Sequence, residues 1–282
     1  MSVIQNAFSV DVEDWFQVGA FENTLKRGDW GALEPRVERN TDACLALFAE
    51  SGVKATFFTL GWVAERYPAL VRRIVEAGHE VASHGYDHQR VFTLTPAQFA
   101  EDIARTRKLL EDASGQVVTG YRAPSFSIDA RTPWAHEALA AAGYTYSSSV
   151  APVKHDHYGW PEAPRFAFKP VAGSDLIELP ITTARFAGRT LAAGGGGFFR
   201  LLPYGFSTWA IRQVNAAGAP ASFYFHPWEI DPDQPRVANA PLRSKVRHYT
   251  NLGAMAGKLK RLSTQFTWGR YDAVVADLAA QL

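Results

Sequence analysis

The pair His84 and His88 is the part of this sequence whose residue types and spacing are best suited to chemistry. Side chains four residues apart lie on one side of a helical turn, so both imidazoles can point at a single ion. Divalent zinc, nickel or cobalt would suit two imidazole ligands. Because His-x-x-x-His also occurs by chance, the pattern predicts a metal site only if partners come from elsewhere in the chain.

Acidic partners follow the first segment that is typical of a buried strand. This segment covers residues 7–12, and Asp11, Glu13 and Asp14 lie at its C-terminal end. In α/β folds, acids at the C-terminal ends of parallel strands are commonly catalytic. We therefore interpret this cluster as part of the same site.

A cation and a further histidine also follow predicted strands. Arg122 comes after a strand at 117–121, and His226 comes after a strand at 221–225. The carboxyl ends of parallel strands meet at one rim of the fold. We therefore expect both side chains to lie beside the acids and the histidine pair.

The elements that must position these residues alternate between strand and helix. The predicted strands cover residues 7–12, 54–60, 80–83, 117–121, 144–146, 176–179 and 221–225. The predicted helices cover residues 37–51, 67–76, 95–114, 133–142 and 205–217. Repeated βα units predict an α/β fold of the distorted (β/α) barrel type, with seven strands. The run Gly194–Gly197 lacks the Lys-Ser/Thr of a phosphate-binding loop, and we interpret it as a flexible loop on the substrate side.

Composition limits the class of protein. A chain of 282 residues that is 47% hydrophobic can bury one large core. The formal net charge of +1 and the absence of a Lys/Arg run argue against a nucleic-acid partner. A single cysteine, Cys44, excludes an internal disulfide, and residues 1–6 lack the features of a secretory signal. We expect a cytoplasmic protein without a transmembrane segment, whose membrane contact, if any, is peripheral at the inner face.

The combined set of acids, paired histidines, arginine and lone histidine fits metal-assisted hydrolysis. In such a reaction the ion polarises a carbonyl and a water molecule, a carboxylate removes a proton, and a histidine protonates the leaving amine. An amide is therefore the expected bond. Glycoside hydrolysis needs two carboxylates at one bond and ordinarily has no use for the histidine pair, so it ranks lower.

Five motifs make the sequence similar to the polysaccharide deacetylases with the NodB homology domain, which form carbohydrate esterase family 4. The likeness covers nearly the whole chain and is greatest to the subgroup of exopolysaccharide loci of the exosortase type. The segments that carry it are Ser9–Trp15, Ala55–Trp62, Gly78–Gly85, Gly120–Ser127 and Phe225–Pro232. Arg247–Leu252 also resembles the C-terminal extension of that subgroup. The resemblance implies a single domain over 1–282, in which about 236–282 is an extension packed on the barrel.

The resemblance also implies roles for residues of this chain. Asp11 matches the catalytic base, His226 matches the catalytic acid, and Arg122 matches the residue that orients the base. The family holds its acid histidine with an aspartate–tryptophan motif that has no clear counterpart here. The remaining candidates for that task are Glu229, Glu178 and Asp175.

His84 and His88 match two metal ligands of the family, and the backbone N–H of Ser125 matches its oxyanion donor. The third ligand is open, because the family has adjacent aspartates where this chain has Asp11, Val12, Glu13 and Asp14 in succession. Strand alternation places Glu13 on the face of Asp11, whereas a bulge at the strand end would turn Asp14 inward. We favour Asp14.

Aromatic and additional histidine residues are weighed against simpler explanations. Trp15, Trp160 and Trp228 could stack on sugar faces, although core packing is the usual role of tryptophan, and Trp228 is the best candidate. His155 and His157 have ligand-like spacing but fit a solvated loop better.

The expected function is removal of an N-acetyl group from an amino sugar of a surface polysaccharide or of its biosynthetic intermediate. The expected cofactor is one divalent metal, zinc in the first place, with nickel or cobalt as alternatives. The expected partner is an N-acetylated sugar, lipid-linked or nucleotide-linked. Two rivals remain, a hydrolase of a small non-sugar amide and a non-catalytic glycan-binding protein.

Overall fold

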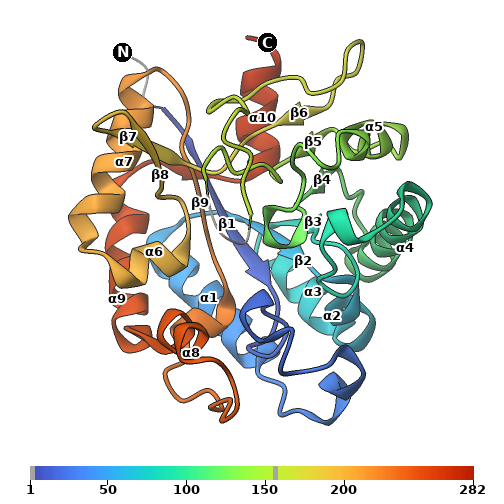
Figure 1. Cartoon of the computed structure of the whole chain (residues 1–282), viewed down its shortest axis with the longest axis vertical. Coiled ribbons are helices and arrows are strands. Elements are labelled where there is room, and N and C mark those ends of the chain that lie inside the picture. Colours follow the sequence, from blue (N-terminus) through green and yellow to red (C-terminus); the bar gives the residue numbers. More distant parts are fainter. Residues whose placement is uncertain (1–3, 155–157) are drawn as a thin grey trace.

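The computed structural model describes residues 4–154 and 158–282, which form a half-barrel of parallel strands surrounded by helices (Figure 1). The described sheet has eight strands, and its main path runs in the order β10-β1-β2-β3-β4-β5-β6, with β9 on the other side of β1. The strands are β1 Asn6–Val12, β2 Thr56–Thr59, β3 Glu80–Ser83, β4 Gly120–Tyr121, β5 Tyr146–Ser147, β6 Ile177–Glu178, β9 Ser222–Phe225 and β10 Trp268–Gly269. The predicted barrel fold is confirmed, and β10 is one strand more than the seven expected.

The strand register places the predicted site residues at one edge. Val12 pairs with Thr59, Thr59 pairs with Ser83, and Ser83 pairs with Tyr121. Because all these strands are parallel, the residues that follow them start from the same level of the sheet. Those residues are Glu13, Leu60, His84 and Arg122.

The barrel is open between β6 and β9. No strand pair joins them among the described residues, but the chain between them runs beside β9, where Thr182 and Ser222 exchange two side-chain hydrogen bonds of 3.1 and 2.7 Å. On the other side, Val10 of β1 pairs with Phe225 of β9. This register sets Asp11 and His226, the next residues, level with each other.

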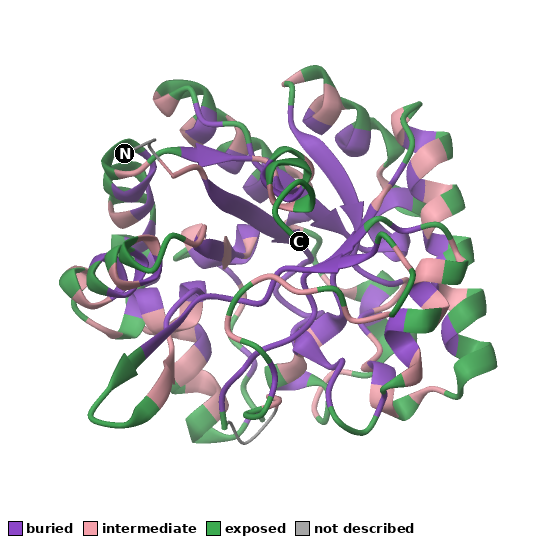
Figure 2. Cartoon of the chain, turned by 90° about the horizontal axis from the view of Figure 1, so that it is seen from above, coloured by how far each residue is buried: buried purple, intermediate pink, exposed green. Residues whose placement is uncertain are grey.

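Helices cover the outside of the sheet. They are α1 Val37–Ser51, α2 Gly61–Arg66, α3 Pro68–Glu76, α4 Pro96–Ser114, α5 Trp134–Ala141, α6 Gly196–Leu201, α7 Tyr204–Ala216, α8 Leu242–Tyr249, α9 Leu252–Gln265 and α10 Tyr271–Ala279. A hairpin of β7 Thr183–Phe186 and β8 Arg189–Ala192 precedes α6. Seen from above (Figure 2), the strands form the buried centre and the helices expose their outer sides, as their amphipathic sequences require. None of the described helices is both long and apolar enough to cross a membrane.

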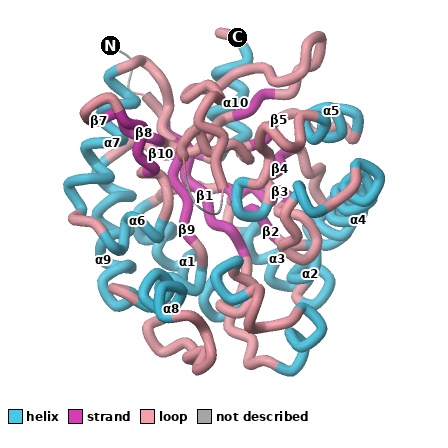
Figure 3. Tube along the Cα trace, in the orientation of Figure 1, coloured by secondary structure: helices cyan, strands magenta, loops and turns pink. Residues whose placement is uncertain are grey.

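The C-terminal segment contributes to the barrel itself. Figure 3 shows α8 and α9 beside the half-barrel, and β10 follows them and pairs in parallel with the first residues of β1. The hydroxyl of Tyr271, the first residue of α10, accepts a 2.7 Å hydrogen bond from Arg122. Residues 236–282 therefore pack on the barrel and also supply one of its strands.

The prediction of a flexible loop at 194–197 is wrong. Helix α6 begins at Gly196, and a β-carbon at that position would lie 2.2 Å from Oε1 of the buried Glu229. A β-carbon at Gly195 would lie 2.7 Å from the hydroxyl oxygen of Tyr224. The glycines are there because the backbone passes close to these two side chains, and not because the segment must move.

Candidate active site

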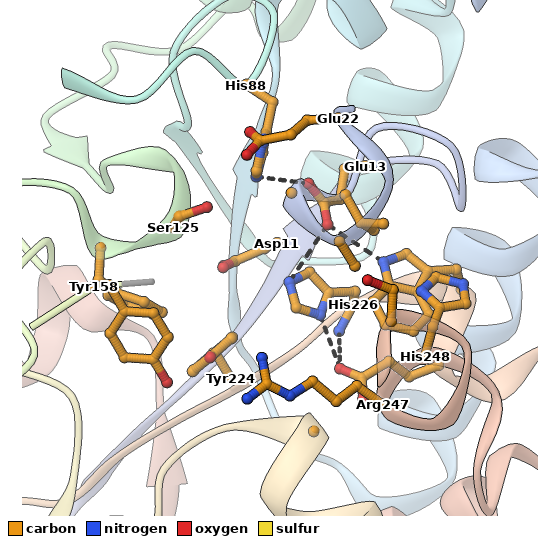
Figure 4. A pocket seen from close by; sticks show the side chains of 18 of the residues that line it. Asp11, Glu13, Glu22, His88, Ser125, Tyr158, Tyr224, His226, Arg247 and His248 are labelled. Atoms are coloured by element: carbon orange, nitrogen blue, oxygen red, sulfur yellow. Dashed lines mark hydrogen bonds and ion pairs between the residues drawn. The ribbon is translucent and has the colours of Figure 1, made fainter. Parts of the chain in front are cut away.

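A cavity of about 810 Å³ opens at the carboxyl ends of the strands and collects most of the predicted site residues (Figure 4). The predicted residues that line it are Asp11, Glu13, His84, His88, Ser125, His226 and Trp228. Arg122 lies directly behind this wall and is 1% exposed. The carboxyl ends of the strands, where the sequence predicts the site, therefore surround a concave cavity.

Glu13, His84 and His88 form a cluster whose nitrogen and oxygen ligand atoms all lie within 4.8 Å of one another. All three side chains are buried. The expected helical turn is wrong, because residues 84–88 form a loop in which Gly85 and His88 have positive φ values of 71° and 59°. A positive φ is unfavourable for histidine, so the loop holds a strained residue at the point where it turns the imidazole toward Glu13.

Hydrogen bonding determines which nitrogen of His84 can bind an ion. Its Nδ1 lies 2.9 Å from the backbone carbonyl oxygen of Arg122, and a carbonyl can only accept. Nδ1 therefore carries the proton, and the lone pair is on Nε2. Burial lowers the pKa of His84 to about 4, against the opposing effect of Asp11, which keeps the imidazole neutral at physiological pH.

The cluster fits a divalent cation. Oε2 of Glu13 is buried without a hydrogen bond among the described residues, although Nε2 of His88 lies only 3.0 Å away. Burial alone would raise the pKa of Glu13, but His88 and His226 outweigh it and lower that pKa to about 2. An ionised carboxylate, the oriented neutral imidazole of His84, a second imidazole and an orphaned oxygen are the features of a two-histidine, one-carboxylate metal site.

The structure contradicts the choice of Asp14 as the third ligand. One oxygen of its carboxylate accepts hydrogen bonds from the backbone N–H groups of Arg36 (2.7 Å) and Val37 (3.0 Å), and the other accepts from Trp15 (2.8 Å). Asp14 thus accepts hydrogen bonds from backbone N–H groups at the start of α1, and no bulge turns its side chain into the cavity. The alternation of side-chain directions continues past the end of β1, so the side chain of Glu13 lies beside the two histidines.

Asp11 lies next to the cluster and is held by Arg122. The Nη1 group of Arg122 donates to Asp11 Oδ1 over 2.6 Å and to the hydroxyl of Ser9 over 2.7 Å. Its other donors go to the carbonyl and hydroxyl oxygens of Ser148 and to the hydroxyl of Tyr271. A fully satisfied buried guanidinium fixes the position of this carboxylate.

His226 follows β9, level with Asp11 on the adjacent strand, and is held by Glu229. Its Nδ1 donates to Glu229 Oε1 over 2.8 Å, and its Nε2 lies 3.5 Å from Glu13 Oε1. Glu229 in turn accepts a 2.6 Å hydrogen bond from the buried Arg200. Burial would lower the pKa of His226, but the charge of Glu13 and the hydrogen bond to Glu229 raise it to about 9, so the imidazole is protonated at neutral pH.

Of the three carboxylates considered for holding His226, the structure places Glu229 there. Glu178 accepts instead from the backbone N–H groups of Ser149 and Val150, both over 2.8 Å. Asp175 is exposed ahead of β6, at the opposite end of the strand.

Trp228 does not have the position expected of a sugar platform. It is 6% exposed, and its indole is stacked between His226 at 5.0 Å and His248 at 4.0 Å. Its Nε1 lies 3.3 Å from Glu13 Oε1 and donates to it. Trp228 therefore helps to hold the carboxylate of Glu13 in place. Ser125, in contrast, is on the cavity wall, with φ of 56°.

Sequence reasoning missed the residues that hold the catalytic groups from distant parts of the chain, because no spacing links them to their partners. They are Arg200, Tyr271 and His248. An arginine three residues after a glycine run was the available signal for Arg200. His155 and His157 lie outside the described residues.

Two family models match adjacent parts of the chain. Residues 29–147 match the model "Polysaccharide deacetylase", and residues 148–276 match "Domain of unknown function (DUF3473)". Residues 29–147 of this chain are therefore similar to a polysaccharide deacetylase domain. The deacetylase match includes His84, His88 and Arg122, while the second match includes His226 and Glu229. A single cavity thus joins residues from both matches.

Similar proteins agree with this assignment. Residues of this chain are 33% identical over 106 positions to the peptidoglycan deacetylase of Helicobacter pylori, which is 38% of this chain and 35% of that protein. A chitin deacetylase of Pestalotiopsis is 31% identical over 121 positions, or 42% of this chain and 40% of that protein. The matched part therefore spans well under half the length of these relatives.

Solved structures share the fold. A polysaccharide deacetylase structure from Mycobacterium smegmatis aligns with a TM-score of 0.60 at 21% identity, over all of this chain and 96% of that one. PuuE allantoinase aligns with a TM-score of 0.61 at 17% identity, over 97% of this chain and 89% of that one. At these identities the alignments establish the fold alone.

Proposed function

We propose that this chain removes an N-acetyl group from an amino sugar, in a surface polysaccharide or an intermediate of its synthesis, and that it uses one divalent metal. The observation that carries the proposal is the arrangement of three groups in one cavity. The Glu13, His84 and His88 cluster shares the cavity with a carboxylate held by an arginine and a protonated histidine held by a carboxylate. Metal-assisted amide hydrolysis needs these three parts in one site.

A divalent metal held by Glu13, His84 and His88 would supply Lewis-acid activation of the acetyl carbonyl and of water. Asp11 is the proton acceptor in this proposal, since Arg122 holds its carboxylate in place beside the cluster. His226 is the proton donor for the departing amine, because its Nε2 faces the cavity while Glu229 occupies Nδ1. The backbone N–H of Ser125 is the proposed donor to the oxyanion.

Zinc is the first choice of metal, because two imidazoles and one carboxylate are a common catalytic zinc donor set, and nickel or cobalt can use the same ligands. Metal analysis of the purified protein tests this choice. Removal of the metal with a chelator should abolish acetate release from N-acetyl amino sugars, and zinc should restore it. Acetate release that continues without metal would contradict the proposal.

The cavity favours a sugar over a small amide. Its volume of about 810 Å³ is near the upper end of small-molecule sites, and four further aromatic rings line it, from Phe126, Tyr158, Phe198 and Tyr224. Flat aromatic rings suit the apolar faces of sugars. Acetate release from N-acetyl sugars alongside a panel of small non-sugar amides separates the two hydrolases, and glycan binding without any release would indicate a binding protein. The exosortase-type context remains a prediction. The cytoplasmic location is also a prediction, and cell fractionation can test it.

A further inference from the structure

The β7–β8 hairpin and helix α7 expose a group of apolar and basic side chains that do not line the catalytic cavity. They are Arg185, Phe186, Arg189, Trp209 and Arg212, which we call the hairpin face. Phe186 is 65% exposed and Trp209 is 36% exposed, and their rings meet edge to face with centroids 6.2 Å apart. Figure 1 shows the hairpin and α7 side by side at the upper left. Aromatic rings from two elements thus meet at the surface of the protein.

The hairpin is fixed to α7, so the hairpin face has a defined shape. The side-chain amide of Gln213 accepts a hydrogen bond from the backbone N–H of Arg185 over 2.7 Å and donates to its carbonyl oxygen over 3.0 Å. Nearer the base of the hairpin, Ala184 is buried in a small cluster with Ala210 of α7. Because these two neighbours in β7 are anchored, Phe186 cannot turn its ring into the core.

The turn at the tip of the hairpin has an apolar residue where a polar one is usual. Ala187 and Gly188 both have positive φ values, of 48° and 75°. Two-residue turns of this kind are normally formed by Asn-Gly or Asp-Gly, because Asn and Asp tolerate the left-handed conformation better than other side chains do. Ala187 is nevertheless exposed at the first position. An apolar residue at such a position is expected if the tip enters an apolar medium.

The segment that forms the hairpin face contains no acid. Residues 179–228 include four arginines and no Asp or Glu, whereas at the average of 28 acids in 282 residues this stretch would contain about five. Arg200 is buried against Glu229 and adds nothing to the surface charge. The other three, Arg185, Arg189 and Arg212, are exposed and form no ion pair with the described residues. The hairpin face is therefore positive as well as apolar.

A neighbouring loop continues the same combination of side chains. The guanidinium of Arg165, in the loop before β6, donates to the hydroxyl and carbonyl oxygens of Thr183 over 3.1 and 2.8 Å. Burial and the nearby charge of Arg185 lower the pKa of Arg165, as expected where cations gather. The next residue, Phe166, is another exposed ring, at 36%. Arginines and exposed rings therefore extend beyond residues 179–228.

Aromatic rings flanked by arginines suit the boundary between water and an anionic lipid bilayer. Aromatic side chains settle at the level of the headgroups, and arginines are attracted by the negative surface potential. We propose that the hairpin face docks on a membrane surface that contains anionic phospholipids, with Phe186 and Trp209 entering the headgroup region and the three arginines lying on the headgroups. This inference goes beyond the proposed deacetylation and does not depend on it.

Two features of the protein bear on this choice of partner. A second copy of the chain, docked through the same face, would bring two positive surfaces together, which is unfavourable. A bilayer with anionic lipids supplies the opposite charge. In addition, helix α6 follows the hairpin, and its exposed Leu201 also lines the cavity, so docking would bring the cavity close to the membrane.

The test is co-sedimentation of the purified protein with lipid vesicles. One set of vesicles contains phosphatidylcholine alone, and the other contains equal parts of phosphatidylcholine and phosphatidylglycerol. We expect the protein to bind the anionic vesicles at least about tenfold more tightly than the neutral ones, because each arginine near an anionic surface contributes roughly fivefold. Raised salt should reduce this preference, since it screens the surface charge.

Two variants of the hairpin separate the apolar and the charged contributions. Phe186→Ser should weaken binding to anionic vesicles about tenfold, because an aromatic ring is no longer removed from water. The double variant Arg185→Gln with Arg189→Gln should weaken it about 25-fold and should abolish most of the dependence on salt. Thermal melting shows whether each variant is folded, and the double variant tests the inference alone if Phe186→Ser is not.

Matched controls remove similar groups from other parts of the surface. Val117→Ser changes an apolar side chain that is 72% exposed before β4. Arg72→Gln with Lys108→Gln removes two exposed charges, from α3 and α4. Both controls should bind vesicles as the wild-type protein does. Acetate release from a soluble N-acetyl sugar should be the same in all these variants, so its absence would bear on the proposed function alone.

Failure to sediment with either set of vesicles would overturn the inference, and so would vesicle binding that survives in both hairpin variants. Analytical ultracentrifugation without lipid tests the second copy: a dimer that Phe186→Ser separates would make the hairpin face an interface between copies. Alginate, a soluble acidic polysaccharide, tests a glycan partner. Binding to alginate that depends on Arg185 and Arg189, without binding to vesicles, would assign the hairpin face to a glycan and overturn the inference.

Discussion

Glu13 and Asp14 are adjacent acids that the backbone turns in different directions. The carboxylate of Glu13 lies with two histidines in the cavity, whereas that of Asp14 accepts backbone hydrogen bonds at the start of α1. Burial raises the pKa of Asp14 to about 6, despite its hydrogen bonds from Arg36 and Trp15. An acid with a raised pKa and three backbone partners is a structural group, and these two residues form a matched pair for experiment.

Glu13→Gln should lose metal and Asp14→Asn should keep it. Removing a ligand should weaken metal binding by more than the roughly 10- to 100-fold that changes around a metal site cost. Asp14→Asn should instead lower the free energy of unfolding by about 1–2 kcal/mol, because it weakens hydrogen bonds to buried N–H groups. Metal content and chemical denaturation of both variants check this. Metal loss in Asp14→Asn alone would return the ligand to Asp14.

Asp11 and His226 should fail in different ways, since they are assigned opposite proton transfers. Asp11→Asn should keep metal and lose turnover by roughly 10²- to 10⁴-fold. His226→Ala should also keep metal, but an activated substrate with a better leaving group should recover much of its rate, because that group needs no proton to depart. Kinetics on an amide and on an aryl ester of acetate provide the comparison.

An equal response of both variants to the leaving group would contradict this division of labour. Loss of metal from His226→Ala would make His226 a ligand, for which its 3.5 Å distance to Glu13 leaves room.

Helix α6 positions the proton donor through the absence of a side chain. Gly196→Ala would place a β-carbon 2.2 Å from Glu229, which is fully buried and cannot withdraw. We expect a loss of about 1–3 kcal/mol of stability and a fall in turnover on the order of 100-fold, because His226 loses its orientation.

Gly197→Ala is the matched control on the same helix, since its β-carbon would meet nothing within 4 Å. Alanine favours helix over glycine, so this variant should be up to about 1 kcal/mol more stable. Similar losses in both variants would show that α6 tolerates no alanine for reasons unrelated to Glu229.

The sequence predicts the elements well wherever they carry a strong local pattern. Seven of the strands and the helices at α1, α3, α4, α5 and α7 follow from residue periodicity and end signals, and Thr95 indeed forms the predicted start of α4 with a capping box. β10 has only two residues and no such pattern, because its pairing with β1 depends on contacts more than 250 residues apart. The same limit applies to Arg200, whose partners come from η5 (Pro227–Ile230) and the end of α8.

The two ends of the barrel contain buried acids in different surroundings. The end opposite the cavity contains Glu80, which accepts hydrogen bonds from Thr56 of β2, Tyr146 of β5 and the backbone of Asp272 in α10. Burial and the charge of Asp272 raise the pKa of Glu80 from an ordinary 4.5 to about 7. The stability of this end of the barrel should therefore depend on pH, although Glu80 takes no part in the proposed reaction.

Glu80→Gln should flatten the pH dependence of stability. Between about pH 4.5 and 7 the native state keeps a proton that the unfolded state has lost, so the free energy of unfolding falls as pH rises through this window. The shift corresponds to roughly 3 kcal/mol at most. Denaturation at pH 5 and pH 8 should show this loss in the wild-type protein and less of it in the variant. Glu50→Gln, at an exposed carboxylate, should retain the wild-type slope.

The close approach of Gly196 to Glu229 also has a consequence for evolution. Glu229 can be kept only if position 196 lacks a β-carbon and position 200 supplies a guanidinium. A mutation at one of these three positions should therefore favour changes at the other two. In an alignment of relatives, these three columns should covary. A homologue with alanine at the position of Gly196 should have replaced both Glu229 and Arg200, and should orient its histidine with a residue from another segment of the chain.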